Sequence, residues 1–128
     1  MTGQMAQHEV FALEQAAMAR WCNGDPDGFL EICAGDVTYF DPFVARRIDG
    51  LAALRAYYET LRGKVFASRY EFLDVHVQEA GDIAILTYCF HSWGGTEAAM
   101  RWNCTEVFRR AGESWQIVQT HWSFQAKD

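Results

Sequence analysis

The sequence predicts an α+β fold in which helices come first and an antiparallel sheet follows. In the first half, apolar residues recur at helical spacing. In the second half, runs of β-type residues are separated by short turns that contain glycine. The chain has 128 residues, half of them hydrophobic, which is enough for one domain with its own core. We therefore expect a single domain over residues 1–128, with about residues 1–5 flexible.

Three helices are predicted in the first half. The first covers residues 4–21, because apolar side chains fall there on one helical face. The second is short and begins at Pro26. The aspartates on either side of Pro26 favour a helix start, because acidic side chains are stabilised near the positive end of a helix. Gly35 ends this helix. The third runs from residues 49–50 to residue 61, and Gly63 is suited to its C-terminal cap.

Five strands are predicted. A short one, residues 37–40, follows the second helix and ends at Asp41-Pro42. Turn sequences with glycine then separate four longer strands, which form successive hairpins. Their ranges are 68–78, 83–93, 98–109 and 114–124. The helices should therefore cover one face of an antiparallel sheet.

Charge and composition exclude several classes of function. A net charge of −6 with scattered basic residues disfavours binding to nucleic acid or to a membrane surface. The sequence contains no apolar run of about 18 residues that could span a bilayer. Residues 1–10 do not resemble a signal peptide, so we predict a cytoplasmic protein. The four cysteines and four histidines lack metal-ligand spacing, so no metal or cofactor is expected.

Several segments resemble a known family. Residues 23–42, which begin Asn-Gly-Asp and end Asp-Pro, resemble the first half of NTF2-like small-molecule proteins. Residues 50–58 resemble their third helix, and residues 109–123, ending His-Trp-Ser, resemble the last hairpin of SnoaL-like domains and of the kinase association domain. The resemblance implies a cone-shaped, cystatin-like fold, with three N-terminal helices packed on a curved antiparallel sheet around a pocket. That fold hosts isomerases, dehydratases, cyclases, epoxide hydrolases and catalytically silent hubs.

In such a cone, alternate residues of each strand point inward. Alignment of the last strands predicts twelve inward residues: Leu86, Tyr88, Phe90, Ser92, Trp102, Cys104, Glu106, Phe108, Gln116, Val118, Thr120 and Trp122. The alternate residues, with Trp93 and Trp115, should form an outer face, and the resemblance implies a homodimer through it. A slip of one residue would exchange the two sets.

The inward side chains predict a pocket for a small hydrophobic molecule. The alternative is that these aromatic side chains only fill the hydrophobic core, which is the more common role of an aromatic stripe. The predicted substrate-binding residues are Trp21, Tyr39, Leu86, Tyr88, Phe90, Trp102, Phe108, Val118 and Trp122.

Asp41 is the first candidate catalytic residue. In ketosteroid isomerases an Asp-Pro at the end of the first strand supplies the general base, and Asp41-Pro42 matches that position. A carboxylate at the mouth of an apolar pocket can move a proton between two carbons of one substrate. The alternative is an ordinary turn, because Asp before Pro often opens one.

Glu106 and Tyr58 are the candidate donors to a developing oxyanion. Glu106 matches an aspartic acid of the isomerases, and its apolar neighbours should raise its pKa and keep it protonated. The isomerase's donor tyrosine falls on Ala17, so Tyr58 is the candidate substitute, and Tyr39 and Tyr88 are further candidates. The alternatives are an ion pair between Glu106 and Arg101 or Arg109, a solvent-facing Glu106, and a core role for Tyr58.

Two functions therefore remain open. The first is a cofactor-independent isomerase or lyase that transfers a proton on a small hydrophobic carbonyl compound, with Asp41 as the base. The second is a non-catalytic ligand-binding or dimerisation module. Two carboxyl groups in one cavity would favour the first, and carboxyl groups without a shared cavity would favour the second. An epoxide hydrolase is a weaker reading, because no Asp–Arg–Asp set can be placed.

Overall fold

The computed structural model describes residues 2–95 and 98–127. Met1, in the stretch predicted to be flexible, and Thr96, in a predicted turn, lie outside the described residues. The elements are, in order, α1 (Thr2–Trp21), α2 (Asp27–Leu30), β1 (Cys33–Phe40), β2 (Ile48–Asp49), α3 (Leu51–Glu59), β3 (Arg69–Ala80), β4 (Ile83–Trp93), β5 (Met100–Ala111) and β6 (Ser114–Phe124). In this part of the chain, no helix is long and apolar enough to cross a membrane.

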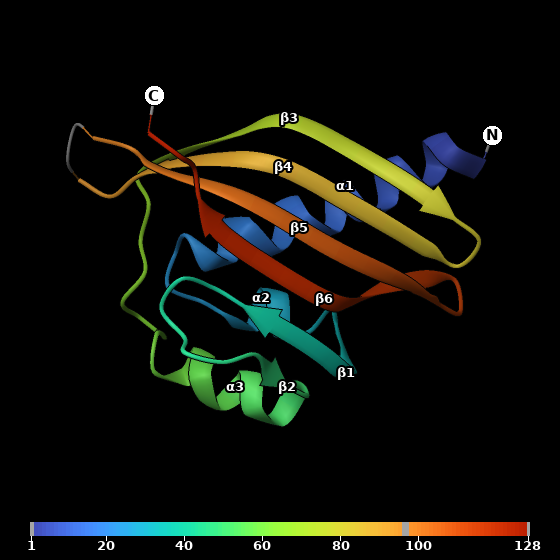
Figure 1. Cartoon of the computed structure of the whole chain (residues 1–128), viewed down its shortest axis with the longest axis horizontal. Coiled ribbons are helices and arrows are strands. Elements are labelled where there is room, and N and C mark those ends of the chain that lie inside the picture. The colour runs from blue at the N-terminus through green and yellow to red at the C-terminus, as the bar shows by residue number, and fades with distance from the viewer. Residues whose placement is uncertain (1, 96–97, 128) are drawn as a thin grey trace.

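The strands form one curved sheet in the order β2-β1-β6-β5-β4-β3. The last four strands are joined as successive antiparallel hairpins, whereas β1 runs parallel to β6. Figure 1 shows α1 lying along one face of β3–β6, with α2 and α3 beside β1. The α+β class and the helices packed on one face of a curved sheet are therefore confirmed.

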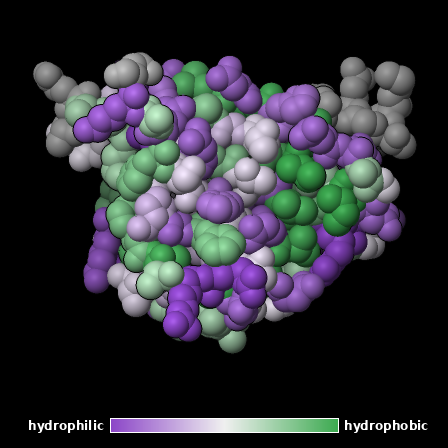
Figure 2. Space-filling view, in the orientation of Figure 1, coloured by the Kyte–Doolittle hydropathy of each residue, from purple (hydrophilic) through white to green (hydrophobic). Residues whose placement is uncertain are grey.

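The other face of the sheet is mixed in character. Because α1 passes behind β3–β6 in Figure 1, the view in Figure 2 shows the opposite, outer face of these strands. Hydrophilic and hydrophobic side chains alternate there, and a group of hydrophobic side chains gathers on the right of the view. This outer face is the one through which a homodimer was predicted.

The second helix is shorter than predicted. It ends at Leu30, whereas the prediction included Ile32 and Cys33 and placed its end at Gly35. The chain joins the sheet at this point, because the Ile32 carbonyl accepts the Ile117 N–H at 2.8 Å and Cys33 pairs with Ile117. A pairing with a distant strand thus overrides the local helical pattern.

A β-bulge interrupts β6. Phe108 pairs with Ile117, whereas its neighbour Val107 pairs with Gln119. Val118 is therefore an extra residue on β6 with no direct partner on β5. Such a bulge changes which side chains of a strand face the core.

The bulge inverts half of the predicted alternation of β6. Thr120, beyond the bulge, is buried as predicted. Before the bulge, Trp115 and Ile117 are buried, and Gln116 and Val118 lie on the opposite face. The predictions that Gln116 and Val118 point inward and that Trp115 lies outward were wrong, because the alternation was counted through the extra residue.

Two arginines connect the three helices. Arg62, after α3, donates to Asp27 of α2 and to Glu59 of α3, each at 2.6 Å. Arg20 of α1 donates to Asp25, just before α2, at 2.8 Å. Each of these exposed pairs adds little to stability, but together they link the helical layer beside the pocket.

Candidate functional site

A pocket of about 410 Å³ opens between the helices and the inner face of the sheet. Its walls are mainly aromatic, with Trp21 and Tyr58 at a centroid distance of 4.8 Å and Trp102 and Trp122 at 5.7 Å. A volume and lining of this kind suit a small hydrophobic molecule. The lining residues are Met18, Trp21, Cys22, Phe29, Tyr39, Asp41, Phe43, Tyr57, Tyr58, Leu61, Val65, Phe66, Ala67, Phe90, Ser92, Gly94, Met100, Trp102 and Trp122.

The mouth of the pocket is apolar as well. Phe43 is 66% exposed and Phe66 is 57% exposed, yet both line the pocket. Phe43 packs edge-on against Trp102, with ring centroids 6.0 Å apart. Exposed aromatic side chains at the opening extend the apolar surface of the pocket to the outside of the protein.

Asp41 supplies the only carboxylate among the described residues that line the pocket. Its Oδ2 accepts hydrogen bonds from the hydroxyl groups of Tyr39, at 2.8 Å, and Tyr57, at 2.7 Å. Its Oδ1 accepts the Phe43 N–H at 2.7 Å, which closes a turn after β1. The catalytic and the turn interpretations of Asp41 are therefore compatible. Its Oδ1 accepts the hydrogen bond that closes the turn, and its Oδ2 accepts the hydrogen bonds from the two tyrosines.

The tyrosines beside Asp41 remain hydrogen-bond donors. Burial raises the pKa of Tyr58 and that of Tyr39 well above the ordinary value. Burial, followed by the hydrogen bond to Asp41, also raises the pKa of Tyr57. All three phenols therefore stay protonated and neutral around neutral pH, and Tyr58 also lines the pocket.

The predicted site residues divide into two groups. Those that line the pocket are Asp41, Tyr58, Trp21, Tyr39, Phe90, Trp102 and Trp122. Those that do not line it are Glu106, Leu86, Tyr88, Phe108 and Val118. Leu86 and Phe108 are fully buried in the hydrophobic core, and Tyr88 is directed to Glu14. Val118 is the extra residue of the β6 bulge, on the side away from the core.

Glu106 lies in the core, behind the pocket. It is 0% exposed, and the Thr120 hydroxyl donates to its Oε1. Burial, and next the nearby charge of Glu14, raise the pKa of Glu106 well above its ordinary value, as its apolar neighbours predicted. The alternative of an ion pair with Arg109 is not realised, because Arg109 donates to Asp36 at 2.9 and 3.0 Å.

Two residues of this region were not predicted. Glu14 lies four residues after Val10 and four before Met18, and all three are buried on one face of α1. The helical spacing of Glu14 with Val10 and Met18 indicates a buried position. However, a search for apolar residues at that spacing passes over an acidic residue. Tyr57 lies within the predicted third helix, but no sequence pattern indicates its contact with Asp41.

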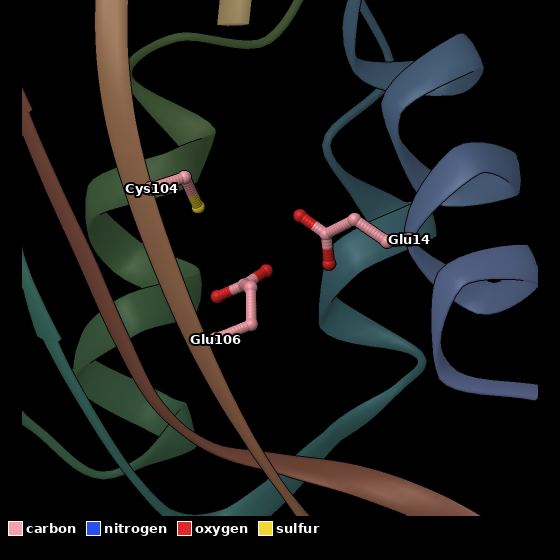
Figure 3. A group of neighbouring side chains, drawn as sticks. All are labelled: Glu14, Cys104 and Glu106. Atoms are coloured by element: carbon pink, nitrogen blue, oxygen red, sulfur yellow. The ribbon is translucent and has the colours of Figure 1, made fainter. Parts of the chain in front are cut away.

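Glu14, Cys104 and Glu106 form a buried cluster whose side chains point toward one another (Figure 3). Their three possible donor atoms lie within 4.8 Å of one another. A closed structural zinc site has four protein ligands, whereas this cluster offers three donor atoms. The cluster therefore fits a closed structural zinc site poorly.

The comparisons with known proteins agree with this architecture. A family model described as a SnoaL-like domain matches residues 10–127. The chain belongs to the SnoaL-like family. No functionally curated protein matches the sequence. The NTF2-like fold predicted from the resemblance is thereby confirmed for this SnoaL-like protein.

Solved structures show the same fold in proteins of different descriptions. A "putative ketosteroid isomerase" from Parabacteroides distasonis is 38% identical, with a TM-score of 0.82, and the match covers 91% of this chain and 85% of that one. An NTF2-like protein of unknown function from Pseudomonas putida is 25% identical over 98% of both chains, with a TM-score of 0.85. A CaMKII hub from S. rosetta is 21% identical, with a TM-score of 0.75, and the match covers 91% of this chain and 94% of the hub chain. The hub shows likeness of fold alone.

Proposed function

We propose that this SnoaL-like protein binds a small hydrophobic carbonyl compound and transfers a proton on it without a cofactor, as an isomerase or a lyase. The observation that carries the proposal is the placement of Asp41, a single carboxylate in an aromatic pocket, held by two phenol groups. The similarity to a protein described as a ketosteroid isomerase supports the same reaction class. Glu106 has no part in this proposal, because it does not line the pocket.

The shape of the pocket restricts the substrate. Aromatic rings line most of it, and its polar groups gather around Asp41, next to Tyr39 and Tyr57. A molecule that fills it should be mainly apolar and rigid, with its polar carbonyl group at the Asp41 end. Ordered aromatic walls favour such a molecule because little side-chain freedom is lost on binding.

The proposed chemistry requires a base and a hydrogen-bond donor. The Asp41 carboxylate takes a proton from the carbon next to the carbonyl group, and the electron pair moves onto the carbonyl oxygen. The Tyr58 hydroxyl donates a hydrogen bond to that developing oxyanion. In an isomerase, Asp41 returns the proton to another carbon; in a lyase, a group on the adjacent carbon leaves instead. Tyr39 and Tyr57 are positioning residues that hold the carboxylate toward the pocket.

Deuterium exchange tests the proton transfer before the natural substrate is known. The protein should catalyse the incorporation of deuterium from D₂O next to the carbonyl group of hydrophobic cyclic ketones, measured by NMR. We expect Asp41→Asn to reduce the rate at least about a hundredfold, as expected for loss of a general base. The matched control is Asp82→Asn, because Asp82 is exposed in the turn between β3 and β4. Equal exchange rates for the Asp41→Asn variant and the wild type would rule out Asp41 as the base.

A second candidate function is binding without conversion. The position of Glu106 favours it, because only one of the two predicted carboxyl groups lines the pocket. Trp21, Trp102 and Trp122 line the pocket, so their fluorescence should report binding directly. Fluorescence changes that saturate with ketones, in the absence of any deuterium exchange, would support this function instead.

We also infer that the protein is a cytoplasmic homodimer joined through the outer face of the sheet. Half-exposed apolar side chains, including Ile85 and Val107, lie opposite each other on the outer face of β4 and β5. Apolar surface of this kind indicates contact with a partner, and the commonest partner is a second copy related by a twofold axis. The four free cysteines fit a reducing compartment.

A further inference from the structure

The cluster behind the pocket contains two carboxyl groups that face each other across the core. Glu14 comes from α1 and Glu106 from β5, and both are 0% exposed (Figure 3). The Tyr88 hydroxyl donates to Glu14 Oε2 at 2.5 Å, and the Thr120 hydroxyl donates to Glu106 Oε1. The remaining oxygens, Glu14 Oε1 and Glu106 Oε2, have no donor from the protein. Each carboxyl group therefore has one oxygen bonded and one free.

A proton is the simplest group that satisfies both free oxygens. Two ionised carboxylates at this depth would each lack solvation and would repel each other. If one carboxyl group is protonated, its O–H can donate to the free oxygen of the other. A single proton then gives both free oxygens a hydrogen-bond partner. The two carboxyl groups face each other, and one oxygen of each lies within 4.8 Å of an oxygen of the other.

The surroundings offer no other source of positive charge. The titratable groups that act on the pair come from four elements: Cys33 of β1, Tyr58 of α3, Tyr88 of β4 and Cys104 of β5. All four are acids that are neutral when protonated, and burial raises the pKa of each. Within the described part of the chain, no arginine, lysine or histidine is among the groups that shift the pKa of Glu14 or Glu106.

We propose that Glu14 and Glu106 form a buried proton-binding site, in which the two carboxyl groups share a single proton at neutral pH. The site does not rest on the proposed function, because neither residue lines the pocket, although both carboxyl groups act on the pKa of Tyr58, the proposed oxyanion donor. Its consequence is a fold that binds a proton more tightly than the unfolded chain does. The protein should therefore lose stability as the pH rises, although its pocket is unchanged.

The sign of the effect follows from the direction of the pKa shifts. Burial raises the pKa of Glu106 and of Glu14 above their ordinary values, so the folded chain retains a proton that the unfolded chain releases. The stability that this proton contributes is fully present below the ordinary glutamate pKa and is lost as the pH rises toward the folded value. For one proton, the unfolding equilibrium constant should increase about tenfold per pH unit over that interval.

The test measures stability against pH in variants of the pair. Urea midpoints, followed by circular dichroism, are measured between about pH 5 and pH 9 for the wild type, Glu106→Gln and the double variant Glu14→Gln with Glu106→Gln. In Glu106→Gln, the amide N–H can donate to Glu14 without a shared proton, so the fall in stability with pH should be smaller. In the double variant it should disappear. The control Glu71→Gln changes an exposed glutamate of β3 and should follow the wild type.

Infrared spectroscopy of the wild type keeps the proposal testable if a variant does not fold. A protonated carboxylic acid has a C=O stretching band that is separate from the carboxylate bands, and we expect this band at neutral pH. Its absence, or a wild-type stability that does not fall with pH, would overturn the shared proton. An increase in the urea midpoint on addition of Zn²⁺, lost in Glu106→Gln, would also overturn it and indicate a cation site.

Discussion

Asp41 shows how several weak contacts can prepare one side chain for chemistry. Tyr39 approaches its Oδ2 from the same strand, two residues earlier, and Tyr57 approaches from α3. A hydrogen bond to a charged group contributes about 1.5–3 kcal/mol, so these two phenols hold the carboxylate firmly in place. The same contacts restrict its rotation, which keeps Oδ2 on the pocket side of the turn.

Tyr57→Phe tests this positioning at the scale of one residue. Removal of one donor should leave the carboxylate less well oriented, so the kcat for deuterium exchange should fall by about five- to tenfold, as expected for one lost hydrogen bond. The KM for the ketone should change little, because the ring remains. Tyr70→Phe serves as the control, since Tyr70 does not line the pocket. An unchanged kcat would show that Tyr57 only packs against Asp41.

At the scale of elements, the β6 bulge allows one strand to serve two purposes. Before the bulge, Trp115 faces the core and its Nε1–H donates to Glu9 of α1 at 2.6 Å. After the bulge, Trp122 faces the pocket and packs near Trp102. A regular strand would direct one of these two tryptophans to the outer face, because side chains alternate with a period of two.

The crossing of α1 and α2 depends on a glycine. A Cβ atom at Gly28 would lie 3.1 Å from the Ala17 Cα and carbonyl oxygen and from the Arg20 Cβ. We expect Gly28→Ala to lower the free energy of unfolding by about 1–3 kcal/mol, because neighbouring backbone must move. Gly35→Ala is the control, since a Cβ there meets nothing within 4 Å. Urea unfolding measures both, and a Gly28→Ala variant as stable as Gly35→Ala would contradict the close packing.

At the scale of the whole molecule, the two faces of the sheet have separate environments. The inner face supplies the core and the pocket, whereas the outer face of β3–β6 is not covered by the helices (Figure 1). Apolar and polar side chains are mixed on that outer face (Figure 2). The separation means that association through the outer face need not alter the pocket.

Val107→Arg tests the predicted homodimer. Val107 lies between Ile85 of β4 and Gln119 of β6 on the outer face, so a charge there would be buried at a sheet-to-sheet interface. The variant should sediment as a monomer in analytical ultracentrifugation, where the wild type should sediment as a dimer. Glu113→Arg, in the exposed turn between β5 and β6, should remain dimeric. A monomeric wild type would exclude the homodimer.

Much of the fold could be predicted because it depends on local patterns. The ranges of β4 and β6 agree with the predicted 83–93 and 114–124, since alternation and glycine turns are encoded within each hairpin. The two-residue strand β2 was not predicted, because it exists only by pairing with β1. The parallel pairing of β1 with β6 was not predicted either, because it joins segments about 80 residues apart.

The sequence by itself determined the α+β class, the SnoaL-like family and the presence of Asp41 after the first strand, because each depends on residues that are neighbours along the chain. Only the tertiary structure decided that Tyr57 donates to Asp41 and that Glu106 faces Glu14 rather than the pocket. The physical reason is that one extra residue in β6 moves the following side chains to the other face of the strand. In the same way, the packing of a helix on the sheet decides which of its side chains meet other residues. Such an effect leaves no mark in composition or spacing, since it depends on which distant backbone groups pair.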